Sequence, residues 1–129
     1  MYIAKAMLSK LEIQNYILID HLNIDLSNQL SVITGETGAG KSIIMGALGL
    51  ILGDRADSSV CREASKKCFI EGIFKLSDAK IHQSFFEENE IELNDELIIR
   101  REINAQGKSR AFINDTPVTL TILKDLTSK

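Results

Sequence analysis

The sequence is poor in residue types that would point to particular classes of protein. It has no tryptophan, one proline and two cysteines in 129 residues. Cys61 and Cys68 have neither a CxxC spacing nor a nearby histidine pair. We therefore expect two reduced thiols, and a disulfide or a metal site is the alternative.

Long apolar runs are also missing. No stretch approaches the ~18–20 apolar residues that a helix needs to cross a bilayer, and residues 1–8 lack the apolar centre of a signal peptide. We expect a cytoplasmic protein with no membrane contact. The sequence assigns no role to the first six residues.

An excess of positive charge is absent as well. There are 15 Lys and Arg against 18 Asp and Glu, which gives a formal net charge of −3. No global field therefore attracts the chain to DNA or to an anionic membrane, although a local basic patch remains possible. We expect no tight DNA binding by this chain alone.

What is present is typical of one globular α/β domain over residues 1–129. The composition is 44% hydrophobic and 26% charged. Alternating or β-rich runs predict strands, and helical patterns follow some of them. The predicted strands are 8–13, 21–26, 30–34, 68–74, 97–103 and 109–113. The predicted helices are 42–52, a short one from Asp78 to about Glu88, and one that starts at Thr119.

Three local signals predict details of these elements. Gly46 and Gly49 in the first helix indicate close packing, and Gly53 is placed to cap its carboxyl end. Residues 104–108 predict the loop of a β-hairpin. In the last helix, residues 120, 123 and 126 are leucines on one face.

One motif carries chemistry. Residues 35–42 fit G-x-x-x-x-G-K-[ST] at every fixed position, between a β-rich run and an apolar helix. This is a P-loop (Walker A), whose backbone N–H groups and helix amino terminus bind the phosphates of a nucleoside triphosphate, predicted to be ATP. The expected binding residues are Gly35, Glu36, Thr37, Gly38, Ala39, Gly40, Lys41 and Ser42.

Two side chains in the motif have separate tasks. Lys41 is expected to stabilise the β- and γ-phosphates, and the Ser42 hydroxyl is expected to be a ligand of Mg²⁺. No catalytic set is complete in this chain. The guanine-reading motif Asn-Lys-x-Asp is absent, which argues against a GTPase.

Residues around the motif resemble the RecN family of bacterial DNA-repair ATPases, which belongs to the SMC-like branch of the ABC ATPases. The stretches that carry the resemblance are Leu11–Tyr16, Ile19–Asp20, Leu30–Ser42, Leu52–Asp57, Leu97–Ile103, Gly107–Asn114 and Pro117–Thr119. The resemblance runs from about Met7 to the end of the chain. It implies a P-loop NTPase fold, the amino-terminal lobe of an ABC/SMC-type head, with a mixed sheet and antiparallel β-hairpins.

The resemblance also implies partners and a process. A coiled coil follows this lobe in the family, the carboxy-terminal half of the same head completes the site, and two heads sandwich two ATP molecules. RecN proteins act in recombinational repair of DNA double-strand breaks, and the whole protein would meet DNA at the nucleoid.

The chain departs from the family pattern where catalysis would be completed. No apolar strand ending in Asp-Glu (Walker B) follows the P-loop, and there is no Leu-Ser-Gly-Gly signature. We therefore expect a half-head that ends before the coiled coil and the Walker B and signature half. The whole protein would be an ATPase, whereas this chain would not turn over ATP alone.

Other interpretations stay open. A small-molecule P-loop kinase could use Asp54, Arg55 and Asp57 in an acceptor pocket, and an ATP-gated scaffold would need no turnover. Arg55 is either loop charge or an interdomain or head–head contact. For the hairpin cations, among them Arg100, Arg101 and Arg110, the choices are solvated charge, a nucleotide or partner contact, and a DNA contact. Strand alternation predicts that Arg100 and Arg101 face opposite sides.

Overall fold

The computed structural model describes residues 2–3, 6–25, 38–56, 58–76 and 79–128, and every structural statement below refers to these residues. Two expectations fall outside them: the strand at 30–34 and Asp78, the predicted first residue of the second helix. The first three residues of the P-loop motif, 35–37, also lie outside.

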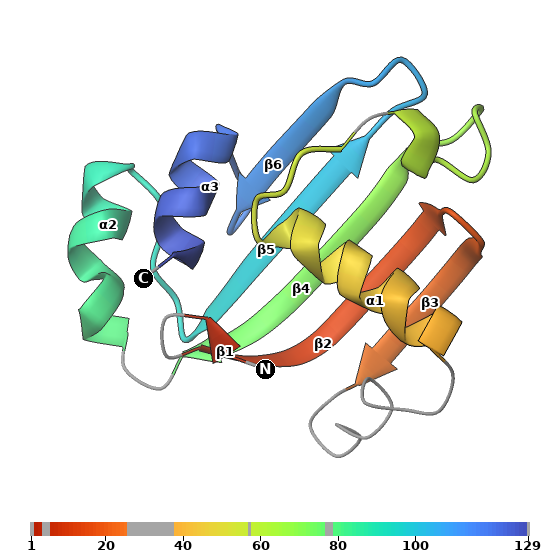
Figure 1. Cartoon of the computed structure of the whole chain (residues 1–129). Coiled ribbons are helices and arrows are strands. Elements are labelled where there is room, and N and C mark those ends of the chain that lie inside the picture. The colour runs from red at the N-terminus through yellow and green to blue at the C-terminus, as the bar shows by residue number, and fades with distance from the viewer. Residues whose placement is uncertain (1, 4–5, 26–37, 57, 77–78, 129) are drawn as a thin grey trace.

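The described strands form one antiparallel sheet (Figure 1). Its order is β1-β2-β4-β5-β6-β7, and β3 pairs with β2 beside β1. The strands are β1 (Tyr2–Ile3), β2 (Ala6–Tyr16), β3 (Ile19–Asp25), β4 (Cys68–Leu76), β5 (Glu96–Ile103), β6 (Ser109–Ile113) and β7 (Thr116–Val118).

The longer helices lie on one face of this sheet (Figure 1). They are α1 (Gly38–Ile51), α2 (Gln83–Glu88) and α3 (Leu120–Thr127), with short 3-10 turns η2 (Ser58–Val60) and η3 (Ala79–His82). Alternation along the strands aims one set of side chains at the helices, and this set forms the core. We call the other side of the sheet its outer face.

Most of the predicted elements are confirmed within the described residues. The hairpin of β5 and β6 has its loop at 104–108, as predicted. Thr119 caps α3, because its side-chain oxygen accepts a hydrogen bond from the backbone N–H of Ile122 at 3.2 Å. Leu123 and Leu126 are fully buried and Leu120 is half-buried, so the predicted apolar face of α3 packs on the core.

Two short edge strands, β1 and β7, were not predicted. β7 follows a tight turn in which Asn114 and Asp115 both have positive φ, 48° and 67°. Such a two-residue turn matches the twist of paired strands and returns the chain onto β6. Pro117 in β7 is tolerated because the strand is at the sheet edge.

The two cysteines are free, as expected. Cys68 is fully buried in β4, and burial raises the pKa of its thiol to about 12. Cys61 donates to the carbonyl of Ile103 at 3.3 Å. Among the described residues, no group of His, Cys, Asp and Glu is arranged to hold a metal ion. In the same residues no helix has the length and apolarity to cross a membrane.

Candidate nucleotide-binding site

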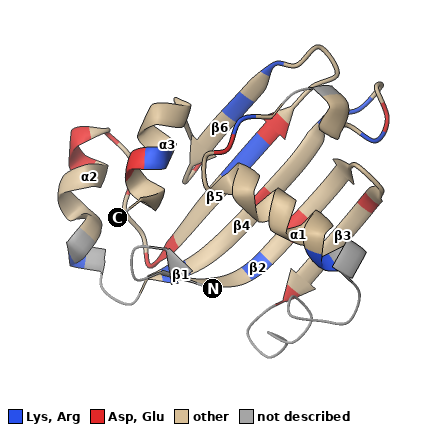
Figure 2. Cartoon of the chain, in the orientation of Figure 1, with Lys and Arg blue, Asp and Glu red and all other residues tan. Residues whose placement is uncertain are grey.

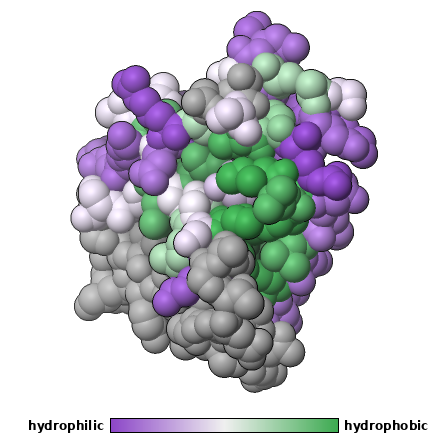
Figure 3. Space-filling view, turned by 45° about the vertical axis from the view of Figure 1, so that its right-hand side comes forward, coloured by the Kyte–Doolittle hydropathy of each residue, from purple (hydrophilic) through white to green (hydrophobic). Residues whose placement is uncertain are grey.

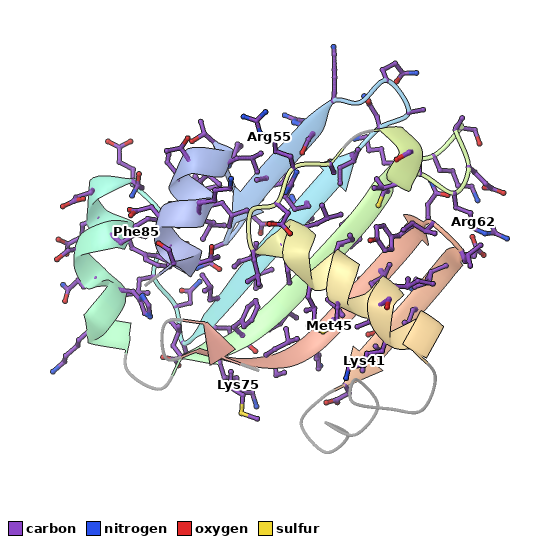
Figure 4. The ribbon with its side chains drawn as sticks, in the orientation of Figure 1. Lys41, Met45, Arg55, Arg62, Lys75 and Phe85 are labelled. Carbon is purple, nitrogen blue, oxygen red and sulfur yellow. The ribbon has the colours of Figure 1, made fainter. Side chains whose placement is uncertain are left out.

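The last five residues of the P-loop motif form the beginning of α1. The helix starts at Gly38, so Lys41 and Ser42 lie in its first two turns, and both are exposed. Figure 4 places Lys41 at the lower edge of the molecule, near the end of β3. The structure therefore confirms a helix at the end of the motif, and this helix begins at Gly38, four residues before the predicted start at residue 42.

The start of α1 suits a phosphate group. The first N–H groups of a helix have no partner within the helix, and the helix dipole makes this end positive. The first turn of α1 contains no acidic residue that would oppose an anion there. With the Lys41 ammonium nearby, this end of the helix favours negative charge.

Close packing on the sheet holds α1 in place. Ala47, Leu48, Leu50 and Ile51 are buried against the strands. Gly72 of β4 leaves room for Ile51, because a Cβ at position 72 would lie 2.6 Å from Ile51 Cδ1. The helix is thus seated directly on the central strands.

The glycines of α1 have the packing role that the sequence predicts. A Cβ at Gly46 would lie 2.6 Å from the Tyr16 hydroxyl, and one at Gly49 would lie 2.5 Å from the Asp54 carboxylate. Gly53 has φ of 111°, and the backbone N–H groups of Gly53 and Asp54 donate to the carbonyls of Leu50 and Gly49 at 3.3 and 3.0 Å. This is a Schellman cap, which ends α1 as predicted.

The carboxyl end of α1 is also fastened by Arg101 of β5. Its side chain is fully buried, and Nη1 donates to the carbonyls of Leu50 at 2.7 Å and Asp54 at 2.8 Å. Nη2 donates to the Ser109 hydroxyl of β6. Burial lowers the pKa of Arg101, and the Asp54 carboxylate opposes this shift. Arg101 therefore joins the P-loop helix to the β5–β6 hairpin.

The role of Arg101 differs from each one considered for it from sequence. It is a fully buried side chain that binds backbone carbonyls, so it is not available at the surface to solvent or to a ligand. A signal was present in the sequence, because Arg101 is in phase with Leu97, Ile99 and Ile103, which all face the core. Arg100 faces the other side, as predicted.

Replacing Arg101 with methionine or alanine is expected to lower the free energy of unfolding by about 2–4 kcal/mol. Either change leaves the carbonyls of Leu50 and Asp54 without their buried donor, which costs about 1–3 kcal/mol for each such group. Urea unfolding followed by circular dichroism would measure the loss. The exposed Lys108→Ala serves as the control, with an expected change within about 0.5 kcal/mol. Equal stability of Arg101→Met and the parent chain would contradict this role.

The other arginines have separate surroundings. Arg100 on the outer face lies near Glu71, Glu102 and Asp115, at 3.7, 3.2 and 3.0 Å, and its guanidinium stacks over Phe112. Arg110 lies over the same ring, 5.6 Å from its centroid. Arg55 is exposed in the loop that follows α1. Neither Arg100 nor Arg101 is brought to the amino end of α1.

A model of the AAA domain family matches residues 10–129. The chain belongs to this family. Its resemblance to RecN proteins is also confirmed by curated relatives. It is 43% identical over 120 residues to the DNA repair protein RecN of Vibrio cholerae and 44% identical over 123 residues to that of Haemophilus influenzae. Each match covers 93% of this chain and 22% of the relative, so the chain spans about a fifth of their length.

Solved structures confirm the fold class. An SMC ATPase structure, from work on ATP-driven dimerization and DNA-stimulated activation, has a TM-score of 0.69 at 23% identity. That match covers 95% of this chain and 78% of the other. The SMC head domain of Thermotoga maritima has a TM-score of 0.59 at 19% identity, covering 92% of this chain and 41% of the other. At this identity the likeness is one of fold: an ABC/SMC-type α/β head lobe.

Proposed function

We propose that this chain binds Mg-ATP as the amino-terminal part of a RecN-like ATPase head that acts in recombinational repair of DNA double-strand breaks. The observation that carries the proposal is the P-loop motif, whose Lys41 and Ser42 stand exposed at the start of a firmly seated helix. The RecN relatives supply the repair role.

The motif assigns its residues to parts of the ligand. Backbone N–H groups of residues 35–40 would bind phosphate oxygens, Lys41 would neutralise the β- and γ-phosphates, and the Ser42 hydroxyl would be a ligand of Mg²⁺. Magnesium would supply charge neutralisation around the phosphates. Both side chains are exposed and so are free to reach a ligand.

The proposed partner of this lobe is the rest of the same head. Met45 on α1 is 43% exposed, and Ile43 and Ile44 beside it are only half-buried. Figure 3 shows a hydrophobic patch near the middle of the face that it views, with hydrophilic residues on both flanks. Contiguous apolar surface of this kind is typical of a docking face, and a protein about five times longer would have the chain to cover it.

The wider assembly follows from the same proposal. Residues 1–129 would form one half-head, a coiled coil and the Walker B and signature half would come from the rest of the protein, and two heads would enclose ATP. The protein would work in the bacterial cytoplasm at the nucleoid.

The rival kinase interpretation finds no favourable arrangement. Its acceptor pocket would need Asp54, but that side chain packs against Gly49. The backbone N–H of Asp54 takes part in the cap of α1, and its carbonyl accepts a hydrogen bond from Arg101. An ATP-gated scaffold would share the nucleotide site and differ only in turnover.

Calorimetric titration with Mg-ATP tests the nucleotide site directly. We expect weak binding, in the micromolar to millimolar range, because the lobe supplies only one side of the site. Chelating magnesium with EDTA should weaken ATP binding by about tenfold, and Ser42→Ala should lose most of this magnesium dependence. No heat of binding at millimolar Mg-ATP would refute the proposal.

A further inference from the structure

A polar groove crosses the outer side of the sheet at the end where β5 turns into β6. One part is a cavity of about 570 Å³, lined by Lys67, Glu102, Asn104, Lys108, Ser109 and Arg110. A second cavity of about 530 Å³ shares Lys67 and Glu102 with it, and its other lining residues include Lys66, Phe69 and the acidic Asp20. The β5–β6 hairpin lies at the top of Figure 1, whereas Lys41 lies at the bottom of Figure 4.

The larger cavity reverses the charge of the chain locally. The larger cavity has three cations, Lys67, Lys108 and Arg110, against one acid, Glu102, in a chain of net charge −3. Figure 2 shows the positive residues on the β5–β6 hairpin and on the loop that precedes β4.

The single acid of the larger cavity is already neutralised. Glu102 lies 3.4 Å from the Lys67 ammonium and 3.2 Å from Arg100 Nε. Lys108 and Arg110 form no ion pair within the described part of the chain. Two cations are therefore left to attract an anion.

Asparagine side chains hold the two loops that line the groove, the loop before β4 and the loop between β5 and β6. Buried Asn15 donates to the carbonyls of Glu63 and Lys66, each at 2.9 Å, and accepts from the Glu63 N–H at 2.7 Å. Asn104 accepts from the N–H groups of Gln106 and Lys108 at 3.0 and 2.9 Å. The loops that carry the lysines are thus set in place before any ligand arrives, which reduces the entropy cost of binding.

We propose that this groove binds the sugar-phosphate backbone of a nucleic acid strand. Lys and Arg with Asn and Ser are the side chains that usually contact phosphate and sugar. Half-buried Phe69 offers a ring on which an unpaired base can stack. The inference rests on the proposed DNA-repair role and adds the surface that meets the DNA.

The shape of the groove favours a strand over a free nucleotide. The larger cavity has no aromatic or aliphatic side chain among its lining residues and so no wall to hold a base. A small-molecule site, by contrast, is mostly apolar. The two cavities instead lie side by side, since they share Lys67 and Glu102, and successive phosphates could lie along them.

Fluorescence anisotropy with labelled 20-nucleotide DNA, single-stranded and duplex, tests the groove. The variant Lys108→Gln/Arg110→Gln is compared with Lys10→Gln/Lys75→Gln, two exposed lysines on the outer face beyond the groove. Both double variants remove two positive charges. Titrations run from about 20 to 150 mM salt, because the slope counts phosphate contacts.

The parent chain is expected to bind weakly, with micromolar affinity at low salt that fades at physiological salt. The groove variant should bind about tenfold less tightly at low salt, with a salt slope smaller by about 1–2. The control pair should change affinity less than about threefold. Phe69→Leu should weaken binding of the single strand and leave the duplex unaffected.

Equal losses in the two double variants would overturn the proposal, because attraction would then depend on net charge alone. Absence of binding by the parent chain at 20 mM salt would overturn it as well. Mg-ATP titration of the groove variant separates this result from the nucleotide site, since Lys41 is at the other end of the sheet and ATP affinity should stay unchanged. If the double variant is poorly folded by circular dichroism, Lys67→Gln takes its place, with an expected loss of about threefold.

Discussion

Replacing Lys41 with alanine is expected to weaken Mg-ATP binding by about 100-fold or more, which takes a weak affinity beyond detection. In the described part of the motif, Lys41 is the only side chain with a full positive charge. A charge-assisted hydrogen bond is worth about 1.5–3 kcal/mol, and a lysine ammonium can make more than one to a triphosphate. A loss of about 3 kcal/mol corresponds to about 150-fold in affinity.

Calorimetry or a fluorescent ATP analogue would measure this loss against Lys10→Ala, which removes an exposed lysine from β2. Lys41 is exposed and forms no ion pair among the described residues, so the thermal midpoint of the variant should match that of the parent. If the Lys41→Ala variant has a normal thermal midpoint and unchanged ATP affinity, Lys41 does not contribute to ATP binding.

Local rules were enough to predict much of the fold from the sequence. Gly53 directly follows an apolar helical run, which predicts that it caps that helix. Thr119 directly precedes a run with helical spacing, which predicts the start of the last helix. The β5–β6 hairpin was set by two β-rich runs and a loop with one glycine. Each of these signals acts over a few residues, and such signals can be read without knowing what packs on them.

The parts that were missed depend on contacts between distant segments. Asn15 lies about 50 positions from its partners Glu63 and Lys66 in the sequence. A local sequence pattern therefore cannot predict their hydrogen bonds. The groove needs the loop before β4 and the β5–β6 hairpin side by side, which only the order of strands in the sheet provides. Arg101 was misinterpreted because a charged residue is expected at the surface unless it is paired.

The sequence predicts the phosphate-binding residues of the nucleotide site but not the contacts that hold their helix. The P-loop is a contiguous motif, so the sequence alone named Lys41 and Ser42 and placed them at the start of a helix. The sequence did not show how this helix is held. Arg101, Gly72 and the Schellman cap fasten its far end, about 10 residues away from Lys41, and so fix the direction in which its amino terminus points.

The largest effect is expected for turnover: this chain alone should release almost no phosphate from ATP, and supplying the rest of the head should raise the rate by orders of magnitude. Phosphoryl transfer needs an oriented water and charge neutralisation around the γ-phosphate in the transition state. Lys41 and a magnesium ion at Ser42 hold the phosphates in the ground state as well, and such uniform binding does not lower the barrier. No Asp-Glu pair ends an apolar strand after the P-loop in this sequence to orient the water.

A phosphate-release assay would compare three samples: the chain alone, the chain mixed with the carboxy-terminal part of a RecN-like head as a second polypeptide, and the same mixture carrying Lys41→Ala. The mixture should be active and its Lys41→Ala form inactive, because activity would need both the phosphate grip of this lobe and the groups that the rest supplies. DNA added to the mixture addresses the groove separately: any stimulation by DNA should be lost in Lys108→Gln/Arg110→Gln while the basal rate stays. Steady hydrolysis by the isolated chain that Lys41→Ala abolishes would show instead a self-sufficient P-loop enzyme, since the water would then be oriented by residues within these 129.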